Sequence, residues 1–387
     1  MPSAVIVTYS AARGPQEELA DYLNELNYNV LFIRHILPDV AKSSLVDPSQ
    51  STALCNSSGS YQLCAHYTHS IGYPYRYLVE IYLSVMWAFR YCPKSDFFFG
   101  VGNICAVSGI FIRCIGHCSK VIFYAIDVVP VRFDNYVLNN MYWFLEAVAA
   151  RFSNIIWNLS STMQAGRHHN SILIRIFGQA PSVVVPMGAL SLISHSDTIT
   201  SRRHASPTVC FFGNLNQRTG ANQLVTIFQL LRAEHSGLRM LVIGDGPCMQ
   251  LLQSEARECH AIDAMTFYGF VSGEPAVHSI LAEAWVALAP YRAETADFVQ
   301  FADPGKLKAY LAAGLPIVGT RISPTVEILQ STGCAIAVSN IDQLIHETSS
   351  LLTDSVKRVR MSTISLEQSR AFLWSNIFTD AMSSLTC

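Results

Sequence analysis

Charged side chains are scarce in this sequence: they make up 14% of its 387 residues, and the formal net charge is −2. Without an excess of positive charge the chain has no field that would attract nucleic acid, so we do not expect a nucleic-acid-binding protein. Half of the residues are hydrophobic, which excludes a disordered chain and predicts a large core or some contact with a membrane surface. The length suits two domains.

Long hydrophobic runs and regular cysteine spacings are also missing. The longest apolar window, residues 97–112, is interrupted by glycines and is too short to span a bilayer. The N-terminal residues lack the basic region and the long apolar stretch of a signal peptide. We therefore expect residues 4–8 to be a first strand. The eleven cysteines follow no repeating pattern, which favours reduced thiols in a cytoplasmic protein over a disulfide framework.

Sequence patterns for metal binding are absent as well. The chain has no D-x-D motif, and the segment from Cys114 to Cys118 lacks a second pair of ligands. His168 and His169 fall in an expected polar loop. We therefore predict no metal site and no bound cofactor.

Hydrophobic periodicity predicts two α/β domains. Residues 4–33 read as strand, helix and strand, which indicates a parallel sheet, whereas residues 38–74 are polar and are expected to form an irregular excursion. From Pro207 onward, strands and helices alternate strictly, which is typical of a doubly wound parallel sheet. We predict an N-terminal domain at 1–190, a linker at 191–206, a C-terminal domain at 207–365 and a final helix at 366–387.

Residues 76–91 form a helical pattern with a broad apolar face that includes Leu78, Tyr82 and Phe89. We interpret this face as core packing, with contact to a membrane surface as the alternative.

A carboxylate follows one of the apolar strands of the first domain. Asp127 comes directly after the run at 121–126, at the carboxyl edge of the predicted sheet, where open α/β sheets bind ligands. Asp127 is therefore our candidate general base. The alternative is a structural role, in which it pairs with Arg132 or caps the next helix.

Residues 285–320 contain the largest number of sequence features that indicate a ligand-binding site. They predict a buried strand, a helix that begins at Asp303 and Pro304 and stops at Gly314, and another buried strand. A helix N-terminus at the edge of a parallel sheet attracts phosphate, and Lys306 adds a positive charge to the same place. A solvated surface lysine is the alternative interpretation.

This stretch is similar to the nucleotide-binding region of GT-B glycosyltransferases. The similarity rests on Ala289-Pro290-Tyr291, on Lys306 and on the segment from Ala312 to Pro316, and the arrangement is closest to the xanthan-type glucuronosyltransferases and relatives in families one and four. The resemblance implies two doubly wound Rossmann-like domains facing a central cleft, with the last helix crossing back to the first domain. It also implies an acceptor in the first domain and a nucleotide sugar, with UDP as the expected nucleotide, in the second.

The resemblance also implies a donor site. Its residues would be Gly213, Arg218, Phe270, Tyr291, Gly305, Lys306 and Leu307, with Lys306 and Arg218 holding the diphosphate. Asn214 and Thr219 stand where family four carries an arginine and a lysine. On the acceptor side it implies Gly14 and Arg132, although Gly14 also fits a plain turn and Tyr291 a core position.

The chain departs from family four in three further positions. Ala302 and Ala309 occupy the places of two glutamates found in retaining members, and Ile126 replaces a histidine. These departures favour the inverting, xanthan-type mechanism with Asp127 as base. The alternatives are a retaining enzyme with displaced carboxylates, a non-catalytic nucleotide-sugar-binding partner, a UDP-sugar 2-epimerase and a NAD oxidoreductase. In the retaining enzyme, Glu294, Asp297 or Asp303 would replace a missing glutamate. The NAD oxidoreductase is suggested by the partial fingerprint from Gly100 to Gly102.

We therefore expect a metal-independent glycosyltransferase of polysaccharide biosynthesis. Its acceptor would be a glycan or a lipid-linked saccharide. We expect a cytoplasmic protein with peripheral contact to the inner face of the plasma membrane, an expectation that rests on analogy.

Overall fold

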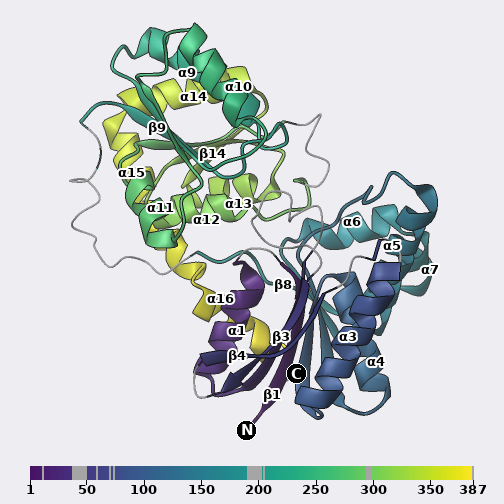
Figure 1. Cartoon of the computed structure of the whole chain (residues 1–387). Coiled ribbons are helices and arrows are strands. Elements are labelled where there is room, and N and C mark those ends of the chain that lie inside the picture. Colours follow the sequence, from purple (N-terminus) through teal and green to yellow (C-terminus); the bar gives the residue numbers. More distant parts are fainter. Residues whose placement is uncertain are drawn as a thin grey trace. The chain divides into compact units, whose positions relative to one another are not determined.

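The computed structural model describes residues 1–10, 13–36, 50–57, 60–68, 71–72, 75–189, 203, 205–292 and 299–385. The chain divides into two compact units (Figure 1). Unit 1 contains Met1–Pro186 and Ile377–Cys387, and unit 2 contains Met187–Asn376. Most of the expected linker at 191–206 lies outside the described residues.

Unit 1 is built on an eight-stranded sheet with the order β4-β3-β2-β1-β5-β6-β7-β8. Its strands are β1 Ser3–Tyr9, β2 Asn29–His35, β3 Gln50–Ser57, β4 Ser60–Thr68, β5 Ser95–Val101, β6 Cys118–Ala125, β7 Ile155–Asn158 and β8 Ser182–Val184. Its helices are α1 Pro15–Glu25, α3 Tyr75–Tyr91, α4 Asn103–Cys114, α5 Tyr136–Phe152, α6 Thr162–Asn170, α7 Ile172–Phe177 and α16 Trp374–Ser383, the last of which begins in unit 2. All neighbouring strands are parallel except in the β2-β3-β4 part, so the predicted parallel sheet is confirmed.

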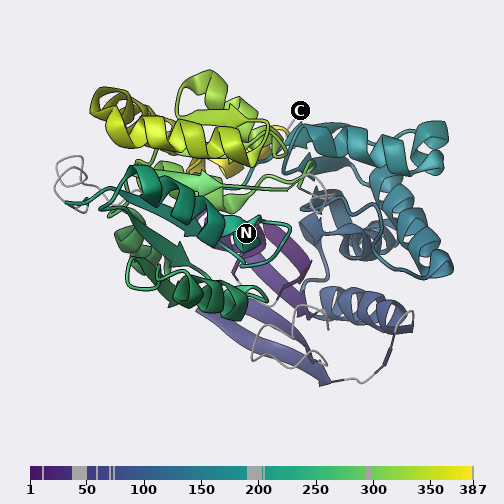
Figure 2. The same cartoon turned by 90° about the horizontal axis from the view of Figure 1, so that it is seen from above.

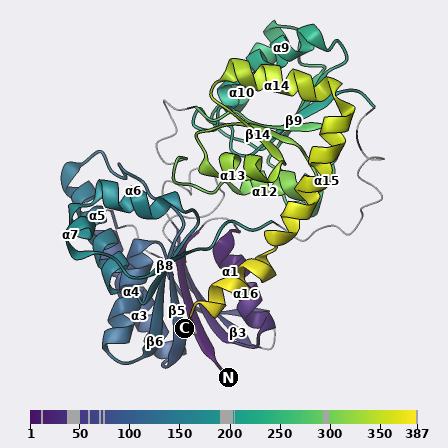
Figure 3. The ribbon, with the colours of Figure 1, turned by 180° about the vertical axis from the view of Figure 1, so that it is seen from behind.

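Helices cover both faces of this sheet because its central strands are apolar on both sides. On one face, Val5 of β1, Leu31 of β2 and Phe98 of β5 form one core cluster with Leu83 of α3. On the other face α1 and α16 lie side by side (Figures 1 and 3), and their rings touch through Tyr22 and Phe378.

Close packing accounts for the glycines between β5 and α4. A Cβ atom on Gly100 would lie 2.3 Å from the backbone of Ala106, so only glycine lets α4 approach the strand. Gly102 begins α4 with a φ of +92°. The helix follows β5 directly and was not expected from the sequence. This geometry explains the partial fingerprint without a dinucleotide.

An antiparallel hairpin replaces part of the irregular excursion expected at 38–74. Strands β3 and β4 lie at one edge of the sheet (Figure 2), and a β-bulge shifts their register between Ala53 and Leu54. Ala53 pairs with Ala65 and Leu54 with Leu63, which leaves Cys64 as the extra residue of the bulge. The prediction of an irregular segment is therefore wrong for 50–57 and 60–68. It failed because the strands carry mostly polar side chains, which hide the alternation that marks a strand.

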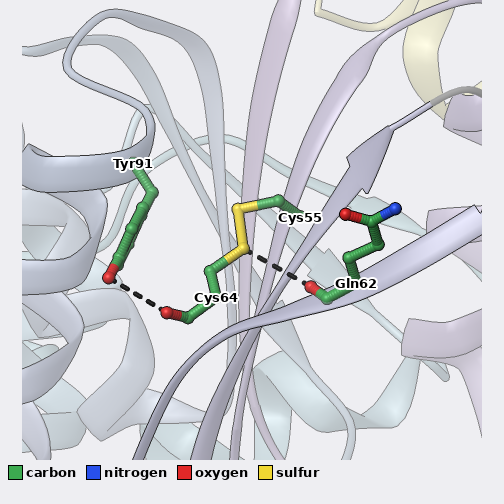
Figure 4. The surroundings of a disulfide bond; sticks show 4 residues. All are labelled: Cys55, Gln62, Cys64 and Tyr91. Carbon is green, nitrogen blue, oxygen red and sulfur yellow. Dashed lines mark hydrogen bonds between the residues drawn. A yellow bond between two sulfur atoms is a disulfide. The ribbon is translucent and has the colours of Figure 1, made fainter.

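The hairpin also holds a disulfide bond. Cys55 and Cys64 are joined, and the hydroxyl of Tyr91 on α3 donates a hydrogen bond of 3.1 Å to the carbonyl of Cys64 (Figure 4). The expectation of reduced thiols throughout is therefore wrong for this pair. The other cysteines in the described part of the chain are free.

Helix α3 exposes the side chains that we expected in the core. Leu78 is 65% exposed, Tyr82 64% and Phe89 51%, whereas Leu83 and Trp87 pack against the sheet. The interpretation of the first three residues as core packing is wrong. The sheet packs against the neighbouring face of the helix, which carries Leu83 and Trp87. The apolar side chains of Leu78, Tyr82 and Phe89 are left uncovered in the described structure.

Unit 2 contains a six-stranded parallel sheet with the order β11-β10-β9-β12-β13-β14. Its strands are β9 Thr208–Phe212, β10 Arg239–Ile243, β11 Met265–Gly269, β12 Val286–Ala289, β13 Ile317–Thr320 and β14 Ala335–Val338. Its helices are the 3-10 turn η1 Ala221–Gln223, α9 Leu224–Glu234, α10 Met249–Glu258, α11 Glu274–Leu281, α12 Gly305–Ala312, α13 Pro324–Thr332, α14 Ile341–Thr353 and α15 Ser355–Ala371. The predicted doubly wound architecture is confirmed.

Alternate residues of the unit 2 strands feed two separate cores. Phe211 packs with α9, α10 and α14, and Cys210 packs with α11, α12 and α13. The two groups of helices lie on opposite faces of the sheet (Figures 1 and 3). The expected single helix near the C-terminus is divided into α15 and α16 by Phe372 and Leu373, and Leu373 bridges to Ala189.

Each sheet has one place where the chain changes its direction of winding. In unit 2 the strands run outward from β9 to β11 on one side and from β12 to β14 on the other, so the change occurs between β9 and β12. In unit 1 the change occurs between β1 and β5. Open α/β sheets bind ligands at the carboxyl ends of such neighbouring strands. The fold therefore predicts one ligand-binding position in each unit, which we call its nominated position.

Candidate active site

Unit 1 has a cavity of about 100 Å³ at its nominated position. Tyr9 ends β1, Val101 ends β5 and Phe123 lies on β6, and all three line the cavity. Two carboxylates, Asp127 and Glu146, line it as well. The remaining lining residues are Tyr77, Gly102, Asn103, Ile104, Ala125, Ile126, Arg132 and Tyr142.

Asp127 follows β6 and presents an exposed side chain to this cavity. Loss of hydration next to the surrounding protein raises the pKa of its carboxyl group, and the positive charge of Arg132 opposes that effect. Asp127 does not cap the next helix, because Asn135 accepts the hydrogen bonds from the first backbone amides of α5. A carboxylate with a raised pKa at the rim of a cavity suits a general base.

Glu146 is a second carboxylate that the sequence analysis did not find. It lies in the middle of α5 and is 2% exposed. Burial raises the pKa of its carboxyl group to about 7, with Arg167 and Asn103 opposing the shift and Asp127 adding to it. A glutamate in a helical pattern usually faces solvent, so no local pattern indicates that Glu146 is buried.

The two residues implied for the acceptor side have different positions. Arg132 lines the cavity. Gly14 is the N-cap of α1, where its amide donates a hydrogen bond of 2.7 Å to the side chain of Glu17, and it does not line the cavity. The structure therefore gives Gly14 a helix-capping role.

Lys306 occupies the nominated position of unit 2. Its Nζ atom is buried, lies 4.1 Å from the ring centroid of Phe211 and 5.1 Å from that of Tyr291, and has no hydrogen-bond partner in the described part of the chain. Burial lowers the pKa of this ammonium group to about 7. A buried ammonium without a counter-ion costs free energy, so the site is suited to an anionic ligand.

Two glycines keep the backbone open around Lys306. Gly213 follows β9 with a φ of +128°, and a Cβ atom there would lie 3.1 Å from Cε of Lys306. Gly220 has a φ of +75°, and a Cβ atom would lie 1.6 Å from the carbonyl oxygen of Pro290. Only glycine lets the 213–220 loop pass so close to the end of β12. Within this loop Thr219 donates a hydrogen bond of 2.7 Å to the carbonyl of Asn214.

Asp303 has a structural role rather than the expected N-cap role. Pro304 is the N-cap of α12, and Asp303 lies one residue earlier, almost fully buried. Its carboxylate is bonded by the amide of Met187 and the hydroxyl of Thr325, each at 2.8 Å, and by the ammonium of Lys308. The N-cap prediction is wrong because non-local partners take the carboxylate, and these bonds leave Asp303 committed to the core.

The other residues of the implied donor site are spread along the same sheet edge. Tyr291 is buried beside Lys306, and burial raises the pKa of its hydroxyl group. Leu307 belongs to the core, and its amide donates to the carbonyl of Pro304. Phe270 follows β11 and is 79% exposed, and Arg218 is exposed in the 213–220 loop. Gly305 is the first residue of α12, and a Cβ atom there would lie 3.3 Å from Cε of Met187.

Tyr310 is another residue that the sequence analysis missed. Its hydroxyl accepts a hydrogen bond of 2.8 Å from the amide of Phe212 and donates one of 3.1 Å to the carbonyl of Leu288. It thereby ties the ends of β9 and β12 together beneath the site. Glu294 and Asp297, considered above as displaced carboxylates, lie outside the described residues.

The described residues contain no group of three or more His, Cys, Asp or Glu side chains arranged to hold a metal ion. His168 and His169 lie in α6, so the expected polar loop at this point is wrong. Within the described ranges, no helix combines the length and hydrophobicity that crossing a bilayer requires.

The C-terminal half of the chain matches a known family. The family model for "Glycosyl transferases group 1" covers residues 206–354. A GDP-mannose-dependent alpha-(1-6)-phosphatidylinositol monomannoside mannosyltransferase of Mycobacterium tuberculosis is 28% identical over 164 residues, which are 42% of this chain and 42% of the relative. The match therefore spans less than half the length of this curated relative.

Solved structures match along the whole chain at low identity. The sucrose-phosphate synthase of Thermosynechococcus elongatus has a TM-score of 0.71 and 14% identity, covering 100% of this chain and 98% of the other. HepE of Anabaena in complex with UDP has a TM-score of 0.69 and 12% identity, covering 100% of both chains. These matches confirm the predicted fold class and the predicted resemblance. Residues 206–354 thus match the family model for glycosyl transferases group 1, and the chain as a whole has the GT-B glycosyltransferase fold.

Proposed function

We propose that this protein is a glycosyltransferase that moves a sugar from a nucleotide-sugar donor to a hydroxyl group of a glycan or lipid-linked acceptor. Unit 2 binds the donor and unit 1 binds the acceptor. The buried ammonium of Lys306, which has no hydrogen-bond partner among the residues that the structure describes, lies at the nominated position of unit 2 and is the observation that carries this proposal. The match of residues 206–354 to a glycosyltransferase family supports it.

Lys306 has the properties that a diphosphate site needs. The leaving nucleotide gains negative charge as the glycosidic bond breaks, and a preorganised positive charge stabilises that change. The rings of Phe211 and Tyr291 hold the ammonium away from water, where its interaction with an anion is stronger. The chemistry requires no metal ion in this proposal, because Lys306, with Arg218 at the loop surface, supplies the positive charge.

The nucleotide is proposed to be UDP. Support comes from HepE of Anabaena, a structural neighbour solved in complex with UDP. The names of the curated relatives state GDP-mannose dependence instead, so a GDP-sugar is the second candidate. The two are separated by direct binding.

Asp127 is proposed as the general base. It removes the proton of the acceptor hydroxyl while the acceptor oxygen forms a bond to the anomeric carbon and the electrons of the breaking bond pass to the diphosphate. Such a displacement inverts the anomeric configuration. Asp303, one candidate for the nucleophile of a retaining enzyme, has its carboxylate engaged by Met187, Thr325 and Lys308, which supports the inverting proposal.

A thermal-shift screen of the full chain tests the donor site. The ligands are UDP, GDP, UDP-glucose, GDP-mannose and NAD, applied to the wild type and to Lys306→Met, which keeps the apolar stem and removes the charge. A ligand at a hundred times its Kd adds about 2.7 kcal/mol, which is a shift of several degrees. We expect a UDP ligand to stabilise the wild type and to stabilise the variant by half as much or less. A shift by NAD alone, or by no nucleotide, would overturn the proposal.

We propose in addition that α3 contacts a membrane surface that carries the acceptor. The exposed stripe of Tyr75, Leu78, Tyr82 and Phe89 is apolar, and the single acidic residue of α3, Glu80, is buried. Arg90 at the end of the helix adds a positive charge for anionic lipid. Co-sedimentation with vesicles of phosphatidylglycerol and phosphatidylcholine should fall strongly in Leu78→Glu. Equal binding of the wild type and this variant would exclude α3 as the contact.

A further inference from the structure

The segment that joins β6 to α5 carries two charged groups of the unit 1 cavity. Residues 126–135 are all described, and they form neither helix nor strand. Asp127, near the start of this segment, and Arg132, further along it, both line the cavity. Because a segment without regular structure lacks a ladder of backbone hydrogen bonds, its position depends on contacts with neighbouring elements.

Two side chains of α5 provide such contacts. The side-chain oxygen of Asn139 accepts hydrogen bonds from the amide of Arg132, at 2.9 Å, and from the amide of Phe133, at 3.3 Å. The indole of Trp143 donates a hydrogen bond of 3.1 Å to the carbonyl of Pro130. All three bonds join a side chain of α5 to the backbone of the segment, so they fix the path of the chain through Arg132.

The position of Arg132 affects the charge state of Asp127. Loss of hydration raises the pKa of the Asp127 carboxyl group, and the positive charge of Arg132 opposes this effect. The other titratable groups that line the cavity are Glu146 and Tyr142 from α5, Tyr77 from α3 and Tyr9 from β1. All of these are neutral or negative, so Arg132 is the one cation among the lining residues of the described structure.

We propose that Asn139 is a positioning residue that holds the backbone at Arg132, so that the guanidinium of Arg132 stays beside the carboxylate of Asp127 in the cavity. Asn139 does not line the cavity, so it acts through Arg132 and not on a substrate. This inference rests on the proposed glycosyltransferase function, in which Asp127 must be ionised to take the proton of the acceptor hydroxyl.

The pH dependence of turnover distinguishes this role from a purely structural one. The full chain is saturated with the nucleotide sugar that stabilises it in the thermal-shift screen, water serves as the acceptor, and release of the nucleoside diphosphate is measured between pH 4.5 and pH 8. Displacing Arg132 raises the pKa of Asp127, so a larger fraction of the base is protonated on the acid side of the profile. In Asn139→Leu we expect kcat there to fall by about three- to tenfold relative to the wild type, and to approach the wild-type value at pH 8. A structural role alone would lower kcat equally at every pH.

Two further variants test whether Asn139 acts through Arg132. Arg132→Gln removes the guanidinium itself and should reproduce the acid-side loss, and combining it with Asn139→Leu should lower kcat by no more than about twofold further. Asn139→Asp keeps an oxygen that accepts from both amides, so its acid-side kcat should stay within about threefold of the wild type. Losses that multiply in the double variant, or a loss in Asn139→Asp equal to that in Asn139→Leu, overturn the inference.

Asn140→Leu is the matched control on the same helix. Asn140 is exposed, and its side chain donates a hydrogen bond of 2.9 Å to the carbonyl of Tyr136 within α5. We expect it to keep the wild-type kcat and pH profile, and an acid-side loss equal to that of Asn139→Leu overturns the inference. If Asn139→Leu does not fold, Trp143→Phe takes its place. It loses the bond to Pro130 and should show a smaller loss confined to the acid side, whereas a loss that is equal at every pH overturns the inference.

Direct titration of Asp127 provides a readout that needs no turnover. NMR of the full chain with isotope-labelled aspartate gives the titration midpoint of the signal that is missing in Asp127→Asn. We expect this midpoint to move to higher pH in Asn139→Leu and Arg132→Gln and to stay in place in Asn140→Leu. If it moves but no nucleotide sugar is turned over, the proposed function fails while the placement of Arg132 by Asn139 stands. If the nucleotide is released and neither the midpoint nor the ratio of rates changes, the inference alone fails.

Discussion

The two units use the same sheet position for opposite electrostatic purposes. The cavity of unit 1, at the ends of β1 and β5, is lined by the carboxylates Asp127 and Glu146. The site of unit 2, at the ends of β9 and β12, contains the ammonium of Lys306 between two aromatic rings. Burial shifts the pKa of Glu146 upward and that of Lys306 downward, each to about 7.

The difference agrees with the separate chemical tasks that we propose for the two units. An acidic cavity attracts hydroxyl groups and can take a proton, whereas an unpaired ammonium attracts a diphosphate. Burial makes the charged form of each group less favourable, and for Glu146 the nearby Arg167 offsets part of that cost. The parallel sheet supplies the position, and the residue that follows the strand or begins the helix supplies the charge.

Replacing Asp127 gives the largest expected effect and would separate the two tasks most clearly. In Asp127→Asn the base is lost, so kcat for sugar transfer should fall by about a hundredfold to ten-thousandfold. The shift in melting temperature caused by the donor should stay unchanged, because Asp127 belongs to unit 1. Asp134→Asn, a change of an exposed carboxylate in the same segment, should leave kcat unchanged. Loss of donor binding in Asp127→Asn would contradict this division of tasks.

Two lysines on α12 allow a similar test inside unit 2. Lys308 is 1% exposed and pairs with Asp303, so Lys308→Met leaves a buried carboxylate unpaired and should lower the free energy of unfolding by about 3–5 kcal/mol. Lys306→Met should leave that free energy equal or higher, since it removes a buried ammonium that no described residue bonds, and should weaken donor binding about ten- to hundredfold. Denaturant unfolding and calorimetric titration measure the two quantities. If both variants changed both quantities alike, Lys306 would be a structural residue as well.

Local sequence patterns pointed to Asp127 and Lys306 as candidate site residues, but they did not point to Glu146. Asp127 and Lys306 were singled out because each stands directly after a strand or at the start of a helix, which local sequence patterns reveal, and their roles stay predictions. Glu146 was missed because its burial depends on Arg167 of α6, a partner that no local pattern reveals. The N-cap assignment of Asp303 failed for the same reason, since Thr325 and Met187 compete for its carboxylate.

Prediction of the fold from local sequence patterns also failed where the outcome depends on distant parts of the chain. The alternation of apolar segments was enough to predict both parallel sheets, because their strands are buried on both faces. The β3–β4 hairpin escaped detection because an edge hairpin with polar side chains lacks that pattern. On α3, the periodicity predicted a helix, but only the packed sheet determines that Trp87 lies inward and Tyr82 outward.

The pH dependence of donor binding tests whether the ammonium of Lys306 binds the donor. The pKa of Lys306 is about 7 in the folded protein and near its ordinary value of 10.5 in the unfolded chain. Between these values the unfolded chain binds more protons, so the stability of the ligand-free protein rises with pH across this window. Binding of UDP-glucose needs the charged ammonium and should weaken above pH 7 by up to about tenfold per pH unit. Isothermal titration at pH 7, 8 and 9 checks this, and an affinity that stays constant in the wild type would exclude Lys306 as the group that binds the diphosphate.

Arg218 should show the smallest effect, because its position differs from that of Lys306 in one respect. Its side chain is exposed in the 213–220 loop, so water and salt screen its charge, whereas Lys306 is held in a dry pocket. In Arg218→Ala we expect donor affinity to fall about two- to fivefold at low ionic strength, with most of that difference lost at 0.5 M salt. Titrations at the two salt concentrations measure it, with the exposed Arg321→Ala as the matched control. A salt-independent loss comparable to that in Lys306→Met would mean that the loop closes over the diphosphate and that Arg218 binds it directly.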